Sequence, residues 1–184
     1  STETQPNGVR VETTTTASGE TAARVTVPQG MGSVTVTIPM ARQPEPGDVA
    51  VILHADGTRE VVKNSRPTED GMPVTLHEGA TLEIANRAKD FSDVADDNWA
   101  ADAVAFVSAR ELFSGTTETT YSPNDRMTRA MLMTVLARLE GKDTDTGSTW
   151  YEEGMNWAVE NGISDGTNPN GSITREQLAT MLWR

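Results

Sequence analysis

Trp99-Ala-Ala-Asp-Ala-Val-Ala-Phe-Val-Ser-Ala-Arg-Glu-Leu-Phe-Ser-Gly115 aligns without gaps to Trp150-Tyr-Glu-Glu-Gly-Met-Asn-Trp-Ala-Val-Glu-Asn-Gly-Ile-Ser-Asp-Gly166, an offset of 51 residues. Beyond the glycines, Thr128-Arg129 matches Thr174-Arg175 at an offset of 46, so the intervening loop is five residues shorter in the second copy. An internal repeat with motifs in a fixed order predicts two copies of one structural unit. The repeating unit is predicted to be helix, loop, helix.

Apolar residues in both copies recur three and four positions apart, which predicts one apolar stripe on each helix. The residues are Ala103, Phe106, Val107, Met131, Leu132, Val135, Leu136 and Leu139. Each second helix opens with a threonine that can cap its first turn. Thr174 and Gln177 form a capping box, whereas Thr128 lacks that partner because Met131 occupies the position. Gly115 and Gly166 are predicted to end the first helices in the left-handed conformation.

Before about Asp90 the pattern is period-two alternation with many β-branched residues, which favours sheet. About seven short strands separated by Pro and Gly suggest a small β-sandwich. The expected fold is α+β, with an Ig-like β-sandwich domain over residues 1–88 and a helical repeat domain over residues 89–184. Repeat one spans 91–141 and repeat two spans 149–184, and a third repeat is absent.

Two hairpins are predicted in the strand-rich half. Asp56-Gly57 fits a type I′ turn between residues 49–54 and 60–63. A turn at His77-Glu78-Gly79 would pair Leu76 with Ala80 and Val74 with Leu82. The threonine run 13–16 is either a strand, which we favour, or a glycosylatable stalk.

The formal net charge of -12 argues against nucleic acid or an anionic membrane as partners, because both require a basic face. No apolar run reaches the roughly 18 to 20 residues that a membrane-spanning helix needs, so membrane insertion is not expected. The absence of cysteine excludes disulfides, thiolate metal sites and cysteine nucleophiles. The chain starts on Ser1 and ends on Arg184 within an amphipathic stretch, which is also compatible with a piece of a longer protein.

The ordered motifs of the second half resemble the S-layer homology family, whose repeats read approximately Phe-x-Asp-Val, Trp-Ala, Gly-Ile-x-x-Gly, Phe-x-Pro and Ile-Thr-Arg-Ala-Glu. The first copy has Phe91-Ser-Asp93-Val94, Trp99-Ala100, Leu112-Phe-Ser-Gly115, Tyr121-Ser-Pro123 and Met127-Thr-Arg-Ala130. The second has Gly162-Ile-Ser-Asp-Gly166 and Ile173-Thr-Arg-Glu176. It lacks the aromatic-x-Pro element, and the family usually carries three repeats around a pseudo-threefold axis with ligand grooves between them. The β-rich half resembles segments that precede such repeats in Firmicutes surface proteins.

The resemblance implies a secreted, Gram-positive protein that is cell-wall or S-layer associated. It also implies non-catalytic binding of secondary cell-wall polysaccharide, which often carries pyruvylated amino sugar. Arg129 and Arg175 lie in the first turns of their helices, where free N–H groups and a guanidinium suit a carboxylate. The alternative for each arginine is a surface side chain or an intrachain ion pair. An acidic protein that binds an acidic polymer must rely on such local sites.

The other candidate carbohydrate-binding residues are aromatic, acidic and glycine. Trp99 and Trp150 begin their helices and could stack on sugar rings or belong to the core. Asp93 could bond sugar hydroxyls, or it could act as a turn or cap residue. Gly115 and Gly166 could let the backbone approach a ligand closely.

An enzyme is not expected, because the carboxylate pairs 96–97 and 152–153 are sequence neighbours and cannot face each other across a cleft. No cofactor or metal is expected either: His54 and His77 lie in predicted strands without a ligand pattern. The alternative function is an adhesin or protein-interaction module that acts through the β domain. In that case the helical repeats would have only a structural role. Either self-association or a helix exchanged between chains is expected through the uncovered face of the last helix, which carries Leu178, Met181, Leu182 and Trp183.

Overall fold

A computed structural model of the protein describes residues 1–54, 56–77 and 80–184. The fold is α+β, as predicted, and the strands precede the helices in the described chain. The strands are β1 (Thr2–Thr4), β2 (Arg10–Thr15), β3 (Thr21–Thr26), β4 (Val34–Ile38), β5 (Asp48–Leu53), β6 (Arg59–Val61), β7 (Met72–Leu76) and β8 (Thr81–Asn86). The helices are α1 (Ala101–Ala109), α2 (Arg129–Leu139), α3 (Glu152–Glu160) and α4 (Arg175–Trp183).

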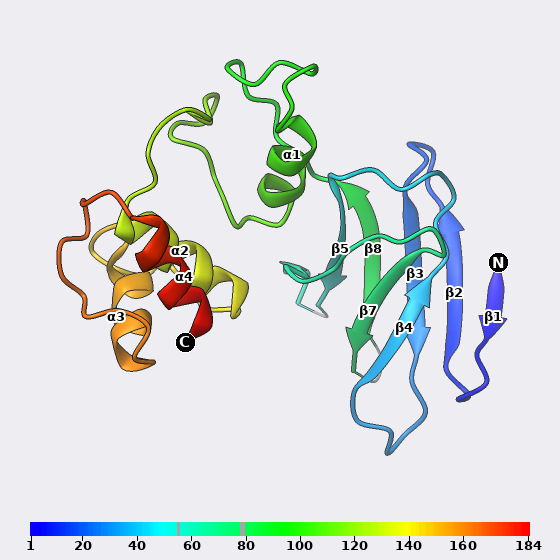
Figure 1. Cartoon of the computed structure of the whole chain (residues 1–184). Coiled ribbons are helices and arrows are strands. Elements are labelled where there is room, and N and C mark those ends of the chain that lie inside the picture. Colours follow the sequence, from blue (N-terminus) through cyan, green and yellow to red (C-terminus); the bar gives the residue numbers. More distant parts are fainter. Residues whose placement is uncertain (55, 78–79) are drawn as a thin grey trace. The chain divides into compact units, whose positions relative to one another are not determined.

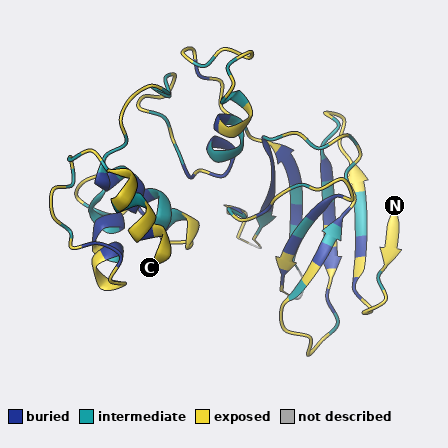
Figure 2. Ribbon diagram, viewed as in Figure 1, coloured by how far each residue is buried: buried dark blue, intermediate teal, exposed yellow. Residues whose placement is uncertain are grey.

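The strands form two antiparallel sheets (Figure 1). The larger sheet has the order β1-β2-β3-β8-β5-β6, and β4 pairs with β7 in the smaller one. Alternation explains the buried face, since successive side chains of a strand point to opposite sides. In β3, for example, Thr21, Ala23 and Val25 are buried, whereas Arg24 and Thr26 are exposed. Side chains from both sheets meet in one apolar cluster. The buried residues of the strands are coloured dark blue in Figure 2.

One predicted hairpin is present and the other is wrong. β5 pairs with β6 around the Asp56-Gly57 turn, with Leu53 opposite Arg59. Residues 78–79 lie outside the described chain, but the strands that flank them do not pair with each other. β7 pairs with β4, and β8 pairs with β3 and β5. Leu76 and Leu82 are both buried in the common cluster, so the apolar pattern that suggested a hairpin reflects a crossing from one sheet to the other.

The threonine run lies in a strand through Thr15, as favoured, because β2 covers residues 10–15 and pairs with β1 and β3. We use the term β region for residues 1–88. Helix α1 packs against this region: Ala109 shares a buried cluster with Val49, Val51 and Val61.

The chain divides into two compact units, Ser1–Ser114 and Gly115–Arg184. Helix α1 therefore belongs to the first unit, whereas α2, α3 and α4 form the second. The first sequence repeat thus contributes one helix to each unit. The predicted domain boundary between residues 88 and 89 lies where the sequence repeats begin. That boundary stays a prediction.

The core of the second unit lies where α2 crosses α3. A Cβ on Gly154 would lie 2.7 Å from the Cα of Thr134, so only glycine permits this close approach. The predicted stripe on α2 is partly correct, since Leu132 is buried and Leu136 packs against the core. The buried face is shifted from it, because Ala130, Met133 and Ala137 are also buried and Leu139 is exposed. On α1 the buried residues are likewise Val104, Ser108 and Ala109, not the expected set.

Two expectations about helix ends are corrected. The cap of α2 is reciprocal after all: Met131 N donates to Thr128 Oγ1 at 3.2 Å, and Thr128 N donates to the Met131 sulfur at 3.5 Å. A thioether is a weak acceptor that can replace the usual carboxylate or amide. Gly115 and Gly166 do have positive φ, but α1 ends at Ala109 and α3 at Glu160. The left-handed residues next to these ends are Glu111 (φ 56°) and Gly162 (φ 69°).

None of the described helices combines the length and the hydropathy that crossing a membrane requires.

Candidate functional site

The N-terminus of α2 is covered by the loop of the second repeat. Arg129 N donates to the carbonyl of Gly171 and Ala130 N donates to the carbonyl of Pro169, both at 2.9 Å. The first N–H groups of a helix have no acceptor within the helix, so these two bonds satisfy them from outside. They also fix the loop to the helix end.

The side chain of Arg129 enters the same loop and is 10% exposed. Its Nε donates to the carbonyl of Thr167 at 3.0 Å. Its Nη2 donates to Ser164 Oγ at 3.1 Å and to Asp165 Oδ1 at 2.7 Å. Of the alternatives for this residue, the intrachain ion pair is therefore formed. Arg129 joins the first repeat to the loop of the second.

Asp165 is the exposed partner of this ion pair, with a side chain that is 67% exposed. The backbone N–H and hydroxyl of Thr167 donate to its carboxylate at 3.0 and 2.9 Å. These bonds, and to a smaller extent the charge of Arg129, lower the pKa of Asp165 below its usual range. The carboxylate is thus ionised at neutral pH and holds the loop in shape.

Arg175 occupies the equivalent position on α4 but has the opposite environment. It is exposed, and within the described residues it makes no hydrogen bond or ion pair. Its helix begins with a full capping box, in which Gln177 N donates to Thr174 Oγ1 and Thr174 N donates to Gln177 Oε1. A guanidinium that needs no internal acceptor stands beside a positive helix end, an arrangement that suits an anion from solution.

The two equivalent tryptophans are both outside the core. Trp99 precedes α1 and is 96% exposed, and Trp150 precedes α3 and is 53% exposed. Trp150 is held edge-on to Tyr151, with ring centroids 5.2 Å apart. By contrast Trp157 is partly buried against the apolar cluster of the second unit. Trp99 and Trp150 thus present indole surface to solvent.

The remaining predicted residues lie in loops. Asp93 is exposed in the turn where Val94 N donates to the carbonyl of Phe91 at 3.0 Å. Gly115 has φ 88°. Gly166 has φ 73°, and a Cβ there would lie 2.8 Å from a methyl group of Val159. Both glycines are therefore explained by backbone conformation or packing.

The structure brings together only part of the predicted set. Arg129 and the loop around Gly166 are in contact, and Asp93 and Trp99 lie in one segment of the first unit. Among the described residues of the second unit, Trp150 and Arg175 make no hydrogen bond or ion pair to the group around Arg129. Sequence reasoning missed Asp165. Its signal is the Asp-Gly-Thr turn at 165–167, which has Ser114 instead of an acid in the first repeat.

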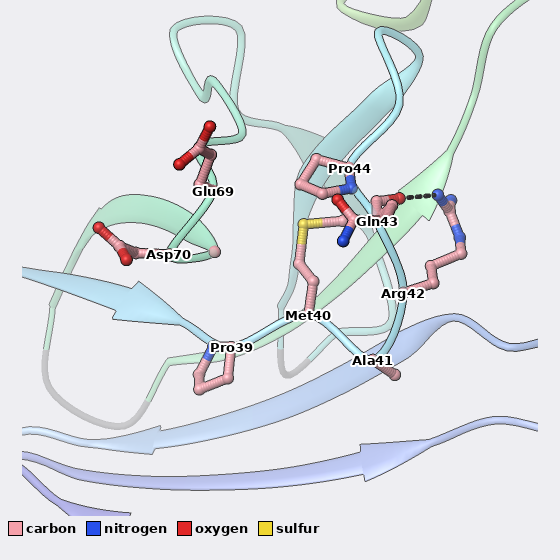
Figure 3. Close-up of a pocket in the computed structure, with 9 residues that line it drawn as sticks. Pro39, Met40, Ala41, Arg42, Gln43, Pro44, Glu69 and Asp70 are labelled. Carbon is pink, nitrogen blue, oxygen red and sulfur yellow. Dashed lines mark hydrogen bonds between the residues drawn. The ribbon is translucent and has the colours of Figure 1, made fainter.

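The first unit also contains a cavity of about 350 Å³ beside the strands (Figure 3). It lies between residues 39–44, which connect β4 to β5, and residues 69–71, which precede β7. Glu69 and Asp70 line it on the side opposite the 39–44 segment, and the carboxylate of Asp70 points away from that segment. The guanidinium of Arg42 is already engaged by the fully buried carboxylate of Asp48. The cavity was not anticipated from the sequence.

Comparison with known proteins places the helical half in a family. The family model described as S-layer homology domain matches residues 90–130 and 142–179. Over 110 residues the chain is 36% identical to an amylopullulanase of Thermoanaerobacterium thermosulfurigenes, covering 52% of this chain and 6% of that protein. Over 112 residues it is 31% identical to the surface-layer 125 kDa protein of Lysinibacillus sphaericus, covering 51% and 10%. It is also 26% identical over 124 residues to an S-layer protein of Bacillus thuringiensis subsp. finitimus, covering 60% and 15%.

The chain thus spans between 6% and 15% of the length of these relatives. No solved structure matches it. S-layer homology domains are non-catalytic modules that anchor proteins to the cell wall, and the relatives include surface-layer and cell-surface proteins of Gram-positive bacteria. The chain is accordingly extracellular and associated with the cell wall. Residues 90–130 and 142–179 are two S-layer homology repeats of this wall-anchoring family.

Proposed function

We propose that this chain anchors a surface protein by binding secondary cell-wall polysaccharide, without catalysing a reaction on it. The observation that carries the proposal is the exposure of Trp99 and Trp150 at equivalent positions of the two repeats. A large indole face in water is unfavourable unless a partner covers it, and flat apolar sugar faces stack on such rings. Repetition of the exposed ring in both copies favours recognition of a repeating polymer.

The charged part of the proposed site is Arg175. Its accessible guanidinium suits the ketal carboxylate of a pyruvylated sugar, which it can bind in bidentate fashion. Arg129 has most of its donors committed to Ser164, Asp165 and Thr167, so in this proposal it holds the loop that carries Gly166. Asp93 would accept bonds from sugar hydroxyls, and Gly115 would allow close approach of the backbone.

Binding to purified cell-wall sacculi tests the proposal. The full chain is expected to sediment with untreated sacculi and to remain in solution after hydrofluoric acid has removed the polysaccharide. Equal binding to both preparations would sink the proposal. Trp99→Ala, Trp150→Ala and Arg175→Ala should each weaken binding about fivefold or more, in line with about 1 to 3 kcal/mol per stacked ring or charged hydrogen bond.

The proposed architecture of the module follows the repeat sequence. A β-sandwich-like, Ig-like domain spans residues 1–88, and an S-layer homology domain spans 89–184 with repeats at 91–141 and 149–184. The apolar cluster shared by both sheets supports the sandwich. The family matches at residues 90–130 and 142–179 support the repeat boundaries.

We also propose that α4 supports self-association. Leu182 and Trp183 are exposed, and Met181 alone is buried in this helix. Sedimentation velocity over a range of concentrations tests this, and a constant monomer mass at high concentration contradicts it. A Trp183→Ser variant should remain monomeric at concentrations where the parent chain associates.

A second candidate function, adhesion or protein interaction through the β region, is favoured by the cavity between residues 39–44 and 69–71. Its acidic rim, Glu69 and Asp70, suits a cationic group. Loss of sacculus binding in Glu69→Gln/Asp70→Asn, with binding unchanged in Arg175→Ala, would favour this candidate over the repeats.

A further inference from the structure

The side chain of Arg110, the residue that follows α1, is fully buried against the β region. Its Nε donates to the carbonyl of Ser65 at 2.8 Å, and its Nη2 donates to the carbonyl of Asp48 at 2.8 Å. Its Nη1 also reaches the carbonyl of Pro46 at 3.2 Å. Three backbone carbonyls from two separate segments of the β region thus converge on one guanidinium.

The same guanidinium is tied to its own helix. Nη1 donates to the carbonyl of Phe106 at 3.0 Å, and Cζ lies 3.6 Å from the centroid of the Phe106 ring. Burial lowers the pKa of Arg110 to about 10, so the group is still charged at neutral pH. The negative charge of Asp48 partly offsets this lowering of the Arg110 pKa. The Asp48 carboxylate in turn accepts hydrogen bonds from Arg42 and, at 2.7 Å, from Glu45 N. A buried charge that is hydrogen-bonded both to the β region and to its own helix fixes the position of the helix.

The two repeats show that this contact is particular to the first. Arg110 aligns with Asn161, which is exposed and donates to the carbonyl of Trp157 at 2.8 Å. Trp157 is the counterpart of Phe106, so both repeats have a hydrogen bond from this side chain to a carbonyl of its own helix. Only Arg110 also donates hydrogen bonds to the β region. The preceding residues differ in the same sense: Ser108 and Ala109 are buried, whereas their counterparts Val159 and Glu160 are exposed.

The linker between the last strand and α1 is also attached to this helix end. Lys89 N donates to Ser108 Oγ at 3.2 Å, and that hydroxyl donates to the carbonyl of Ala105 at 3.2 Å. Arg87 and Glu111 form a further, exposed pair at 3.4 Å, which contributes little by comparison.

We infer that Arg110 is a positioning residue through which the β region acts as the scaffold of the first S-layer homology repeat. The β region then contributes to anchoring, because it fixes the position of α1 and of the preceding residues Asp93 and Trp99. The expected effect on wall binding rests on the proposed function above. The structural part of the inference is that the β region and α1 form one cooperative unit, and this part does not depend on the proposed function.

Hydrogen exchange of the full chain under native conditions, in low concentrations of denaturant, tests the structural part. The amides of residues 104–109 are expected to open with the same free energy and the same denaturant dependence as those of β5 and β8. Amides of α1 that instead open together with α2 and α3 would overturn the inference. This measurement requires no substitution.

Matched variants then assign the role to Arg110. Arg110→Met keeps a long unbranched side chain but removes all of its N–H donors. Asn161→Ala removes the equivalent hydrogen bond at the helix end of the second repeat. Arg110→Met is expected to speed exchange in residues 104–109 about tenfold or more, because buried carbonyls lose their donors. Asn161→Ala should leave these residues unchanged. Unchanged exchange in Arg110→Met contradicts the inference, and Arg110→Lys serves as the milder variant if the methionine chain does not fold.

Sacculus binding separates this inference from the proposed function. Arg110→Met is expected to bind at least about tenfold more weakly than the parent chain, with Asn161→Ala close to the parent. If the parent does not bind sacculi, the proposed function fails while the exchange result stands on its own. If Arg110→Met loosens α1 and yet binds as well as the parent, the β region is no part of the binding module.

Discussion

The guanidinium of Arg129 lies 2.7 Å from the carboxylate of Asp165, one residue before Gly166. Arg129 of the first Thr-Arg pair is therefore used inside the protein, whereas Arg175 of the second pair faces solvent. Two copies of one motif thus have two roles, and substitution can separate them.

Arg129→Ala is expected to lower the free energy of unfolding of the second unit by about 1 to 3 kcal/mol, because the loop loses a nearly buried, charged donor. Arg175→Ala should change it by less than about 0.5 kcal/mol, since its side chain is exposed. Urea unfolding followed by tryptophan fluorescence measures both. Equal destabilisation by the two variants would contradict the distinction drawn between these arginines.

The stability of the second unit should depend on pH through Asp165. Its folded pKa lies below the ordinary 3.8, so its hydrogen bonds stabilise the fold above about pH 4 and are lost as pH falls through the folded pKa. Thermal unfolding between about pH 5 and 2.5 should therefore show a steeper loss in the parent chain than in Asp165→Asn. Glu152, whose pKa is lowered by hydrogen bonds from Ser148, acts in the same direction and is tested separately as Glu152→Gln.

Glu111 and Gly162 occupy the same position after α1 and α3, and both have left-handed backbone. Glu111→Gly is expected to raise the free energy of unfolding by up to about 1 kcal/mol, because it removes the strain of a side chain at positive φ. Gly162→Ala should lower it by about 1 to 2 kcal/mol, although open space surrounds the site. Opposite signs are the diagnostic result, and equal signs would show that backbone strain does not decide these positions.

Gly154→Ala should destabilise the second unit by about 1 to 3 kcal/mol, because the new methyl group would meet the backbone of Thr134 at the helix crossing. In an open helix the same change normally stabilises by roughly 0.5 to 1 kcal/mol. Asn156→Ala, at an exposed position of the same helix, provides the control and should be close to neutral. A stabilised Gly154→Ala chain would mean that α2 and α3 separate easily.

Local patterns were sufficient to predict much of the fold. Alternation identified the strands of the first half, and the duplicated tryptophan-to-glycine segment identified the repeats. The threonine caps of α2 and α4 followed from side-chain chemistry alone. These features depend on residues close together in sequence, where periodicity and capping rules apply directly.

The errors concern contacts between segments that are distant in sequence. The pairing of β7 with β4 could not be read from Val74 and Leu76, since an apolar face fits either a hairpin or a second sheet. The buried face of α2 was misplaced because small residues such as Ala130 and Ala137 carry the crossing. Asp165 was missed as a partner of Arg129 because 36 residues separate them, and Arg110 because a lone arginine at a helix end is usually solvated.

The placement of α1 has a practical consequence for engineering. The family match begins at residue 90, and a fusion protein cut there would lose the β region. Such a cut would remove three of the four carbonyl acceptors of Arg110 and leave the guanidinium with only the carbonyl and ring of Phe106 in its own helix. A graft that retains residues 1–114 as one block keeps that joint intact, whichever cargo is attached ahead of it.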